Sequence, residues 1–490
     1  MKLLFTIVFT IGSVTFAVSQ ANQPCAVSLV ERSYEALGGR SRIDTIRNLQ
    51  FTGYGHRNLL EQSERPEGPF IAQNFTFRGI ADLGNQLFLM DAKDQLFNTS
   101  LKFLVDKEAI AFTSHGRTAP WVREQVLQDE PELNPFAILK TALQSNSLIC
   151  LPDSAIHGLS NRRIQFVWKE HIVRISFNPY TYLYTCIEVQ KPYYDYYLNI
   201  WGDSRKVVLY TWWDLLGNGA HFPMQKDIYF NGQLWESTLI REMNINKPLS
   251  ADSIRIPENI RTLCLSSKDV FLDRVEKMMS AKSEIAKDVW MIPGYCTATV
   301  IRQTDGLTLI EAPHSSGYTD KVVNMAKELY PGVPVKNIIT TSDAWLHCGG
   351  IRTAALEAPV VALSRNKELL ERILKAPYRT EPDRWELEKK KNPVVRYING
   401  RTTLGTGANR VEIIPFNSEA GERMMMVYFP EHKLLYASDL YQPGNWQKHY
   451  TFEVIDAIER EKLDVEFVYA MHSPPVKLSE IKKSMEDLLK

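Results

Sequence analysis

The sequence lacks an excess of charge of either sign. Lysine plus arginine and aspartate plus glutamate both number 57, so the formal net charge of the 490-residue chain is zero. A balanced chain does not attract polyanions from a distance. This argues against nucleic acid or an anionic membrane as the main partner.

Cysteine is scarce, and none of the cysteines forms a CxxC pair. The six positions are scattered along the chain: Cys25, Cys150, Cys186, Cys264, Cys296 and Cys348. Their spacing therefore argues against a zinc knuckle or a dithiol redox motif. It does not indicate which of them pair with one another.

Long apolar runs are also missing beyond the N-terminus. Residues 1–21 place a lysine before an apolar run, and small residues follow at Ala17, Ser19 and Ala21. This order predicts a secretory signal peptide with cleavage after Ser19 or Ala21. A single membrane anchor is the alternative, although the run is short for a spanning helix. We expect an exported protein, periplasmic or extracellular, with no integral membrane segment after cleavage, in which disulfides are permitted.

The chain is longer than one that folds around a single hydrophobic core, and its length predicts two domains. Residues 22–257 begin with a short helical pattern that ends at Gly38-Gly39, and many strand-like runs follow. Asn231-Gly232 between aromatic residues is a hairpin signal, and Pro135–Ser145 is a helical interruption. The pattern predicts a mostly antiparallel N-terminal sheet.

The pattern changes in the second half of the chain. Residues 258–287 are charged and helix-prone, and we expect them to be the connection between the domains. From 288 to 490, strands alternate with helices, which predicts an α/β domain. A buried strand at Val335–Thr341 runs into a loop that ends at Gly349-Gly350, where α/β proteins place reactive groups.

Several features of the first half loosely resemble the LolA/LolB-like lipoprotein-carrier domains. They are Ala36-Leu37-Gly38-Gly39 followed by Ile43 and Ile46, the succession of strands, and Phe222-Pro223 before a hairpin. The resemblance implies a curved antiparallel sheet around helices. It also implies a capacity to hold an apolar molecule.

The second half resembles the metallo-β-lactamase superfamily of hydrolases over about 285–490. Four segments carry the resemblance: Ile310-Glu311-Ala312-Pro313, the loop from Thr341 to Gly350, the strand Met424–Pro430 with Lys433–Asp439, and Tyr469-Ala470-Met471-His472. The resemblance implies an αββα sandwich. The expected fold class is therefore a two-domain α+β and α/β chain with a curved β domain before the sandwich.

The resemblance also places the family's metal ligands on this sequence. His347, Asp439 and His472 match ligand positions, whereas Ser342, Ala344, Leu346 and Ala420 stand where ligands are expected. Two histidines and one carboxylate can bind a single metal and leave positions open for water. His314, Asp343 and Cys348 are additional candidate ligands.

Two functions follow from this ligand set. In the first, His347, Asp439 and His472 hold one zinc, iron or manganese ion, and Asp439 and His472 serve in the hydrolysis of an ester or amide. In the second, no metal binds, the three side chains hydrogen-bond as a core cluster, and the protein is a non-catalytic binding protein for an apolar, peptide or other small ligand. The sequence makes no prediction of the oligomeric state.

Overall fold

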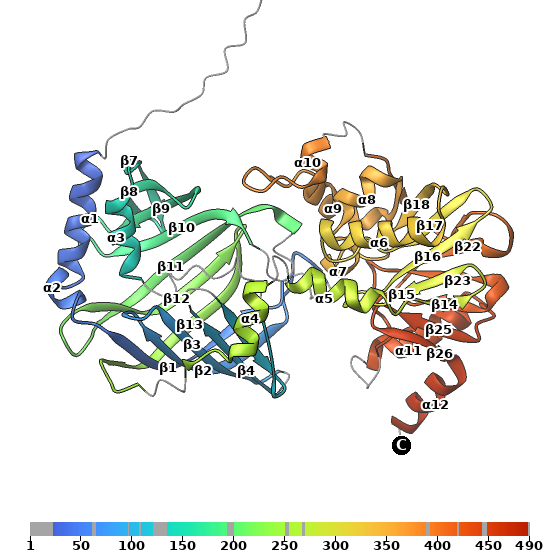
Figure 1. Ribbon diagram of the computed structural model, residues 1–490, viewed down its shortest axis with the longest axis horizontal. Coiled ribbons are helices and arrows are strands. Elements are labelled where there is room, and N and C mark those ends of the chain that lie inside the picture. Colours follow the sequence, from blue (N-terminus) through green and yellow to red (C-terminus); the bar gives the residue numbers. More distant parts are fainter. Residues whose placement is uncertain are drawn as a thin grey trace, which may run out of the picture.

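The computed structural model describes residues 23–488, except 61–64, 97, 107–108, 121–134, 194–199, 250–253, 267–269, 389–392, 419–420 and 443–447. The expected signal peptide and Ala420 lie outside the described residues. Within them, no helix has both the length and the apolar character needed to cross a membrane. The expectation of a mixed α and β chain with large antiparallel sheets is confirmed (Figure 1).

One antiparallel sheet of 13 strands forms the N-terminal half. Its order, β6-β5-β4-β3-β2-β1-β13-β12-β11-β10-β9-β8-β7, consists of two meanders joined where β1 pairs with β13. Asn231 and Gly232 form the turn between β12 and β13, as the hairpin signal predicts. The strands are β1 (Asn48–Asn58), β2 (Ala72–Asp82), β3 (Leu87–Asp94), β4 (Thr99–Val105), β5 (Ile110–Ser114), β6 (Arg117–Pro120), β7 (Ile149–Ile156), β8 (Leu159–Trp168), β9 (His171–Phe177), β10 (Tyr184–Pro192), β11 (Asp203–Leu215), β12 (His221–Phe230) and β13 (Gln233–Ile245).

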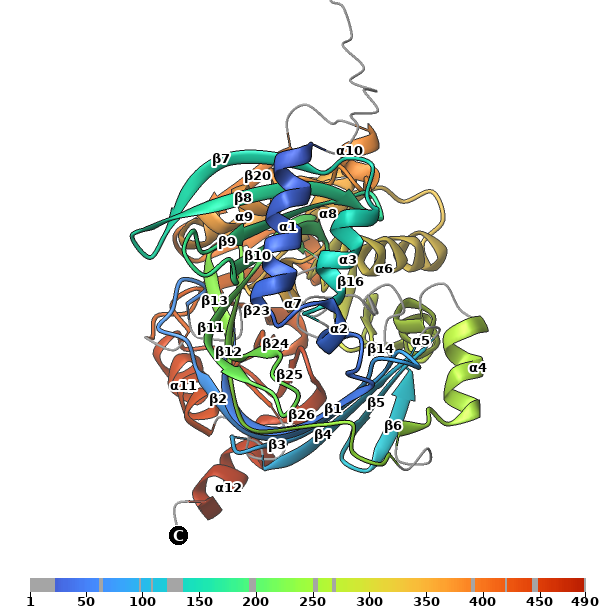
Figure 2. The same ribbon diagram turned by 90° about the vertical axis from the view of Figure 1, so that its left-hand side faces the viewer.

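The sheet curves around three helices, α1 (Pro24–Ala36), α2 (Arg40–Ile43) and α3 (Ala137–Gln144) (Figure 2). Their apolar faces and alternate strand residues form one buried core. Gly38 and Gly39 end the first helical segment with positive φ angles of 111° and 84°, which glycine adopts without a steric penalty.

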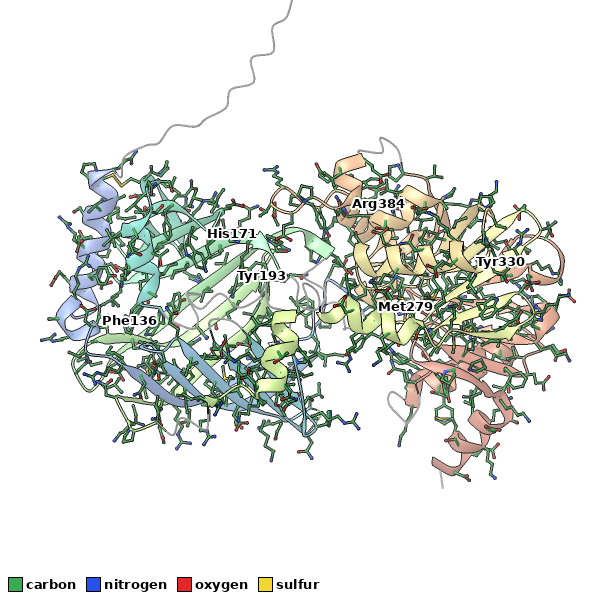
Figure 3. The ribbon with its side chains drawn as sticks, viewed as in Figure 1. Phe136, His171, Tyr193, Met279, Tyr330 and Arg384 are labelled. Atoms are coloured by element: carbon green, nitrogen blue, oxygen red, sulfur yellow. A yellow bond between two sulfur atoms is a disulfide. The ribbon has the colours of Figure 1, made fainter. Side chains whose placement is uncertain are left out.

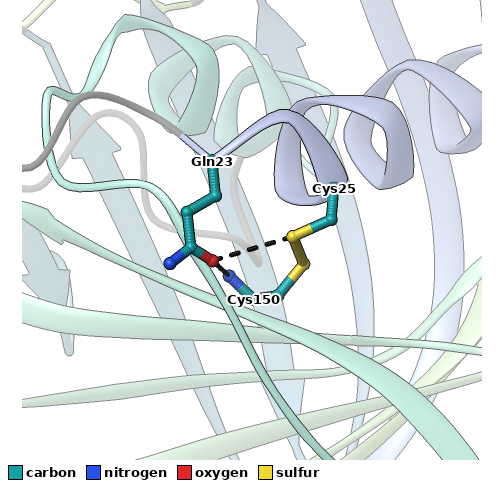
Figure 4. The surroundings of a disulfide bond; sticks show 3 residues. All are labelled: Gln23, Cys25 and Cys150. Atoms are coloured by element: carbon teal, nitrogen blue, oxygen red, sulfur yellow. Dashed lines mark hydrogen bonds between the residues drawn. A yellow bond between two sulfur atoms is a disulfide. The ribbon is translucent and has the colours of Figure 1, made fainter.

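A disulfide fixes the start of α1 to the sheet. Cys25 pairs with Cys150 at the beginning of β7, with a Cα–Cα distance of 6.4 Å (Figure 4). The Gln23 side chain lies beside the bond and accepts a hydrogen bond from the Cys150 N–H at 2.8 Å. The cysteines outside this pair are buried thiols.

The expected connection at 258–287 contains ordered elements. Helix α4 (Glu258–Ser266) covers the outer face of the N-terminal sheet, where Ile260 and Cys264 pack with Leu89 and Leu104. Helix α5 (Val270–Met279) and strand β14 (Ser283–Ala286) follow, and β14 already belongs to the next sheet.

Two further sheets form the C-terminal half. One has the order β14-β15-β16-β17-β18-β19-β20 and the other the order β21-β22-β23-β24-β25-β26. Pairing is parallel from β17 to β20 and between β24 and β25. The remaining strands are β15 (Val289–Ile292), β16 (Ala298–Gln303), β17 (Gly306–Ile310), β18 (Val335–Ile339), β19 (Val360–Leu363), β20 (Val395–Ile398), β21 (Thr402–Leu404), β22 (Val411–Pro415), β23 (Met425–Phe429), β24 (Leu434–Tyr436), β25 (Phe467–Ala470) and β26 (Ser473–Lys477).

The two sheets pack face to face over a shared apolar core that joins Ile310 and Ile339 of one sheet to Val427 and Tyr469 of the other. Helices α6 (Ser316–Leu329), α8 (Ile351–Glu357) and α9 (Lys367–Leu374) cover the outer face of the first sheet. Helices α11 (Lys448–Arg460) and α12 (Leu478–Leu488) cover the second. Two short helices, α7 (Trp345–Cys348) and α10 (Arg384–Glu388), lie in the connections.

The halves meet through polar contacts. The Asp203 N–H, at the start of β11, donates a hydrogen bond to the Pro377 carbonyl at 2.6 Å. An ion-pair chain runs from Glu67 through Arg423 to Asp343, with both pairs at 2.9 Å. Glu67 belongs to the N-terminal half, so this chain ends beside the loop that carries His347.

Candidate functional site

The predicted site residues His347, Asp439 and His472, together with Glu311, follow four strands whose ends lie at one edge of the C-terminal half. Glu311 comes after β17 and Asp439 after β24, and His347 and His472 follow β18 and β25. Both strand pairs are parallel, so the carboxyl ends of each pair meet at one edge of its sheet. The Met425 N–H donates to the Thr341 carbonyl at 2.8 Å and joins the two edges.

Glu311 lies at the centre of the buried hydrogen-bond cluster of the site. Its side chain is fully buried, and its carboxylate accepts hydrogen bonds from the Tyr436 hydroxyl at 2.9 Å, the His347 Nδ1–H at 3.0 Å, the Thr341 backbone N–H at 3.3 Å and the Thr341 hydroxyl. Because Thr341 donates to Glu311, Ser438 must donate its hydroxyl proton to Thr341, at 2.7 Å. Both carboxylate oxygens thereby accept hydrogen bonds from the protein itself.

Two residues of this cluster have a backbone conformation that side chains disfavour. The φ angle is 77° at Glu311 and 53° at Ser438. Such conformations cost free energy and persist where surrounding contacts enforce them. The hydrogen bonds to Thr341 provide that enforcement at both positions.

His347 is fully buried, and its two ring nitrogens have different surroundings. Nδ1 is bound to Glu311, whereas Nε2 has no hydrogen-bond partner among the described residues. Burial acts to lower the pKa of the imidazole, but the charge and hydrogen bond of Glu311 outweigh it, so the pKa is raised above 6.5. The charges of Asp439 and Asp343 act in the same direction.

Asp439 and His472 form a second, more accessible pair. Asp439 Oδ1 lies 3.6 Å from His472 Nε2 and accepts a hydrogen bond from the Gln442 amide at 2.8 Å. The side chains are 21% and 33% exposed, so solvent reaches this pair and not His347. Burial raises the pKa of the Asp439 carboxyl, against the opposing charges of His347 and His472, and burial lowers the pKa of His472.

The side chains that stand in place of the expected metal ligands make contacts that stabilise the loop. The buried Ser342 hydroxyl accepts the Ala344 N–H at 3.1 Å, and Ala344 precedes the first turn of α7. Leu346 packs against the large apolar core. These side chains support the loop conformation.

The three additional candidate ligands have other contacts. The His314 ring stacks on Tyr318 at 5.7 Å and meets Trp345 edge-on at 4.7 Å. Asp343 pairs with Arg423, and the Cys348 thiol donates to the Asp343 carbonyl at 3.2 Å.

His347, Asp439 and His472 meet only part of what a metal site requires. A metal-binding histidine commonly has one nitrogen fixed by a carboxylate and the other free for the metal, and His347 has this arrangement. However, no three His, Cys, Asp or Glu side chains within the described ranges converge to hold a metal. As arranged here, the three residues do not fit a three-ligand site.

Several residues of this site were not predicted from the sequence. Tyr436, Ser438 and Gln442 hydrogen-bond to its members, and Cys296 is buried where the charges of Asp439 and Glu311 act on its thiol. Glu311 carries the clearest sequence signal, because it directly follows a buried strand as Asp439 follows β24. Cys296 carries no sequence signal of a role in the site.

A second candidate site is the hollow inside the N-terminal sheet. An open cleft of about 540 Å³ lies between α2, α3 and the ends of β2 and β3. A narrower cavity of about 40 Å³ adjoins it, and Phe88 lines both. Phe136 marks the α3 end of this hollow, and Tyr193 lies nearer the C-terminal half (Figure 3).

The narrow cavity has mostly apolar walls. They comprise Leu49, Phe51, Phe77, Phe88, Met90, Pro135, Tyr210, Phe222, Pro223, Met224, Lys226, Thr238 and Ile240. The larger cleft combines apolar side chains with two cations, Arg47 and Lys140, and two anions, Asp44 and Asp82. An apolar lining with few polar groups is typical of small-molecule sites.

No family model and no curated protein matches the sequence. Among solved structures, the inverting sec-alkylsulfatase Pisa1 from Pseudomonas sp. matches 49% of this chain with 15% identity and a TM-score of 0.32. A metallo-β-lactamase from Pontibacter korlensis matches 43% with 17% identity and a TM-score of 0.33, and one from Hirschia baltica 42% with 16% and 0.31.

Each match covers only part of this chain. The matched region spans 44% of the alkylsulfatase, 98% of the Pontibacter lactamase and 95% of the Hirschia lactamase. At these identities and TM-scores, no activity or ligand is carried over to this chain. The matches give no support to the LolA/LolB-like resemblance, which stays a prediction.

Proposed function

We propose that the protein binds an apolar small molecule in the hollow of its N-terminal half. The observation that carries this proposal is the apolar cavity that opens beside the cleft under α3. The cleft volume of about 540 Å³ falls in the usual range for ligand pockets, roughly 300–1,000 Å³. Met90 and Met224 in the cavity wall are flexible side chains that can move apart for a ligand.

We propose that the chain consists of two domains, 22–257 and 288–490, with 258–287 between them. The second is a non-catalytic domain of hydrolase-like αββα fold. Support comes from the hydrogen bonds of Glu311, which are used within the protein, and from the ion pair of Asp343 with Arg423. We further propose export to the periplasm or cell exterior, because the Cys25–Cys150 disulfide requires an oxidising compartment.

A neutral fluorescent probe, N-phenyl-1-naphthylamine, tests the binding function. We expect saturable fluorescence enhancement with one site per chain. Met90→Trp places a larger ring in the cavity and should abolish the enhancement. Leu215→Trp is the matched control, because Leu215 is 60% exposed outside the cavity, and it should bind like the wild type. Equal binding by both variants would place the ligand elsewhere.

A second candidate is a hydrolase with one metal. The buried Nε2 of His347, which has no partner among the described residues, favours it. The test is metal content by elemental mass spectrometry on untagged protein after incubation with zinc. About one ion per chain that is lost in His347→Ala would favour the hydrolase. Equal metal content in wild type and variant, whether zero or not, counts against it.

A further inference from the structure

The two halves of the chain meet at two contacts that differ in their chemistry. At the first contact, the buried Asp203 carboxylate accepts hydrogen bonds from the backbone N–H groups of Arg379 and Thr380 at 3.0 and 3.2 Å. Gly202 beside it has a positive φ angle of 58°, and a Cβ atom there would lie only 2.2 Å from the Pro377 carbonyl oxygen. The first contact is therefore a close packing of two backbones, and salt screens its buried carboxylate little.

The second contact consists of two ion pairs between the segment that leads into β2 and the segment that leads into β23. Arg65 pairs with Glu422 at 2.6 Å, and Glu67 pairs with Arg423 at 2.9 Å. All four side chains are partly exposed. An exposed ion pair contributes little to stability and weakens in salt. The second contact is therefore the one that opens more easily.

The segment that leads into β23 is bound on its other side to the loop that carries His347. Arg423 uses Nη2 for the pair with the N-terminal half, and its Nη1 pairs with the buried Asp343 at 2.9 Å. The Met425 N–H donates to the Thr341 carbonyl at 2.8 Å. Displacement of this segment therefore removes contacts from the start of the loop that buries His347.

The geometry points to an ionic latch, in which residues 65–67 of the N-terminal half hold residues 421–424 against the His347 loop, and release of the two ion pairs opens this loop to solvent. The Gln233 amide donates to the Pro66 carbonyl at 3.2 Å, so the latch segment is fixed to the N-terminal sheet. The gated atom is His347 Nε2, which is buried and has no hydrogen-bond partner among the described residues. A small molecule reaches this nitrogen only when the latch is open. The latch requires no ligand in the N-terminal hollow, so its test is independent of the proposed function.

Modification by diethyl pyrocarbonate, followed by mass spectrometry of the His347 peptide, measures the access of a small molecule to this side chain. Arg65→Glu places a carboxylate against Glu422 and should speed the modification of His347 about fivefold, since an exposed ion pair is equivalent to a factor of roughly 1.4–5 in such an equilibrium. Glu422→Arg should have the same effect. His157, exposed in the turn between β7 and β8, is the internal reference and should react at one rate in all proteins.

Two controls separate the latch from a general loss of stability. The double variant Arg65→Glu/Glu422→Arg restores the ion pair with its charges exchanged and should return His347 to the rate of the wild type. Arg162→Glu removes a comparable ion pair, with Asp153 at 2.9 Å, that lies within the N-terminal sheet. It should leave the rate at His347 unchanged.

Salt tests the latch without any substitution and replaces the variants if they do not fold. A rise from about 0.05 to about 0.5 M sodium chloride screens both ion pairs and should speed the modification of His347 in the wild type. The same rise should have little effect in Arg65→Glu, whose latch is already open.

Faster modification of His347 in both single variants, with return to the rate of the wild type in the double variant, supports the latch. A rate in Arg65→Glu equal to that of the wild type overturns it. A double variant that stays as fast as the single variants also overturns it, because the protection would then not depend on the ion pair. If the variants do not fold, a rate in the wild type that does not change with salt overturns it.

Discussion

Replacement of Glu311 by glutamine tests whether the buried cluster is a structural unit. The substitution keeps the shape of the side chain and removes its negative charge. Three of its hydrogen bonds end on Oε1, from Thr341, His347 and Tyr436, and a fourth joins Oε2 to the Thr341 N–H. All four come from side chains or backbone that are buried.

The magnitude follows from these contacts. A hydrogen bond to a charged group contributes roughly 1.5–3 kcal/mol and a neutral one about 1 kcal/mol, so three bonds that lose their charge weaken by about 2 kcal/mol in total. The glutamine NH₂ group would face the Thr341 N–H, donor against donor, which costs about 1 kcal/mol more. Because the variant no longer buries a charge, it avoids the desolvation cost of the carboxylate and recovers part of the lost free energy. We expect a net loss of about 2–3 kcal/mol.

Hydrogen exchange measured by mass spectrometry locates the effect. A loss of about 2–3 kcal/mol corresponds to roughly 30–150-fold faster exchange in peptides that cover β17 and β18. Glu431→Gln is the control, because Glu431 is 54% exposed and its only close ionic partner in the described chain is Arg410 at 3.8 Å. Its exchange should match that of the wild type. An unchanged rate in Glu311→Gln would refute the structural interpretation of the cluster.

Two further predictions concern other parts of the chain. Replacement of both Cys25 and Cys150 by serine should lower the free energy of unfolding by about 5 kcal/mol, since the disulfide closes a loop of 125 residues. A reductant should lower the urea midpoint of the wild type but not of the variant. Six titratable thiols in the unreduced, unfolded wild type would contradict the pairing. Burial lowers the pKa of His314 to about 3, so the unfolded chain binds more protons there between pH 6.5 and 3, and stability falls as the pH falls through this window. At pH 4.5 the free energy of unfolding of the wild type should be lower by about 3 kcal/mol on this account, and this loss should be absent in His314→Asn. Urea unfolding curves that shift with pH by the same amount in both proteins would refute the prediction.

Local sequence signals predicted many elements of the fold. The Asn231-Gly232 turn, the helix at Ala137–Gln144 and the strand at Val335–Ile339 depend on residues close in sequence, and the structure contains all three. The segments expected at the site also lie at one edge, because parallel strands align their carboxyl ends.

The contacts within the site and the hollow could not be predicted in the same way. The role of Glu311 depends on Thr341, His347 and Tyr436, which three separate segments bring to it. The cavity depends on the register of β11, β12 and β13 and on the curvature of the whole sheet. Alternation along one strand shows which residues share a face, but not which strand lies beside it.

The pairing of β1 with β13 has a consequence for biosynthesis. Leu49 lies opposite Ile245, so the central seam of the sheet cannot close until β13 has been synthesised. The first meander ends at Pro120, 125 residues before Ile245, so at about 5–20 residues per second it waits roughly 6–25 s for β13. Such a delay exposes the unpaired strands of the nascent chain to aggregation.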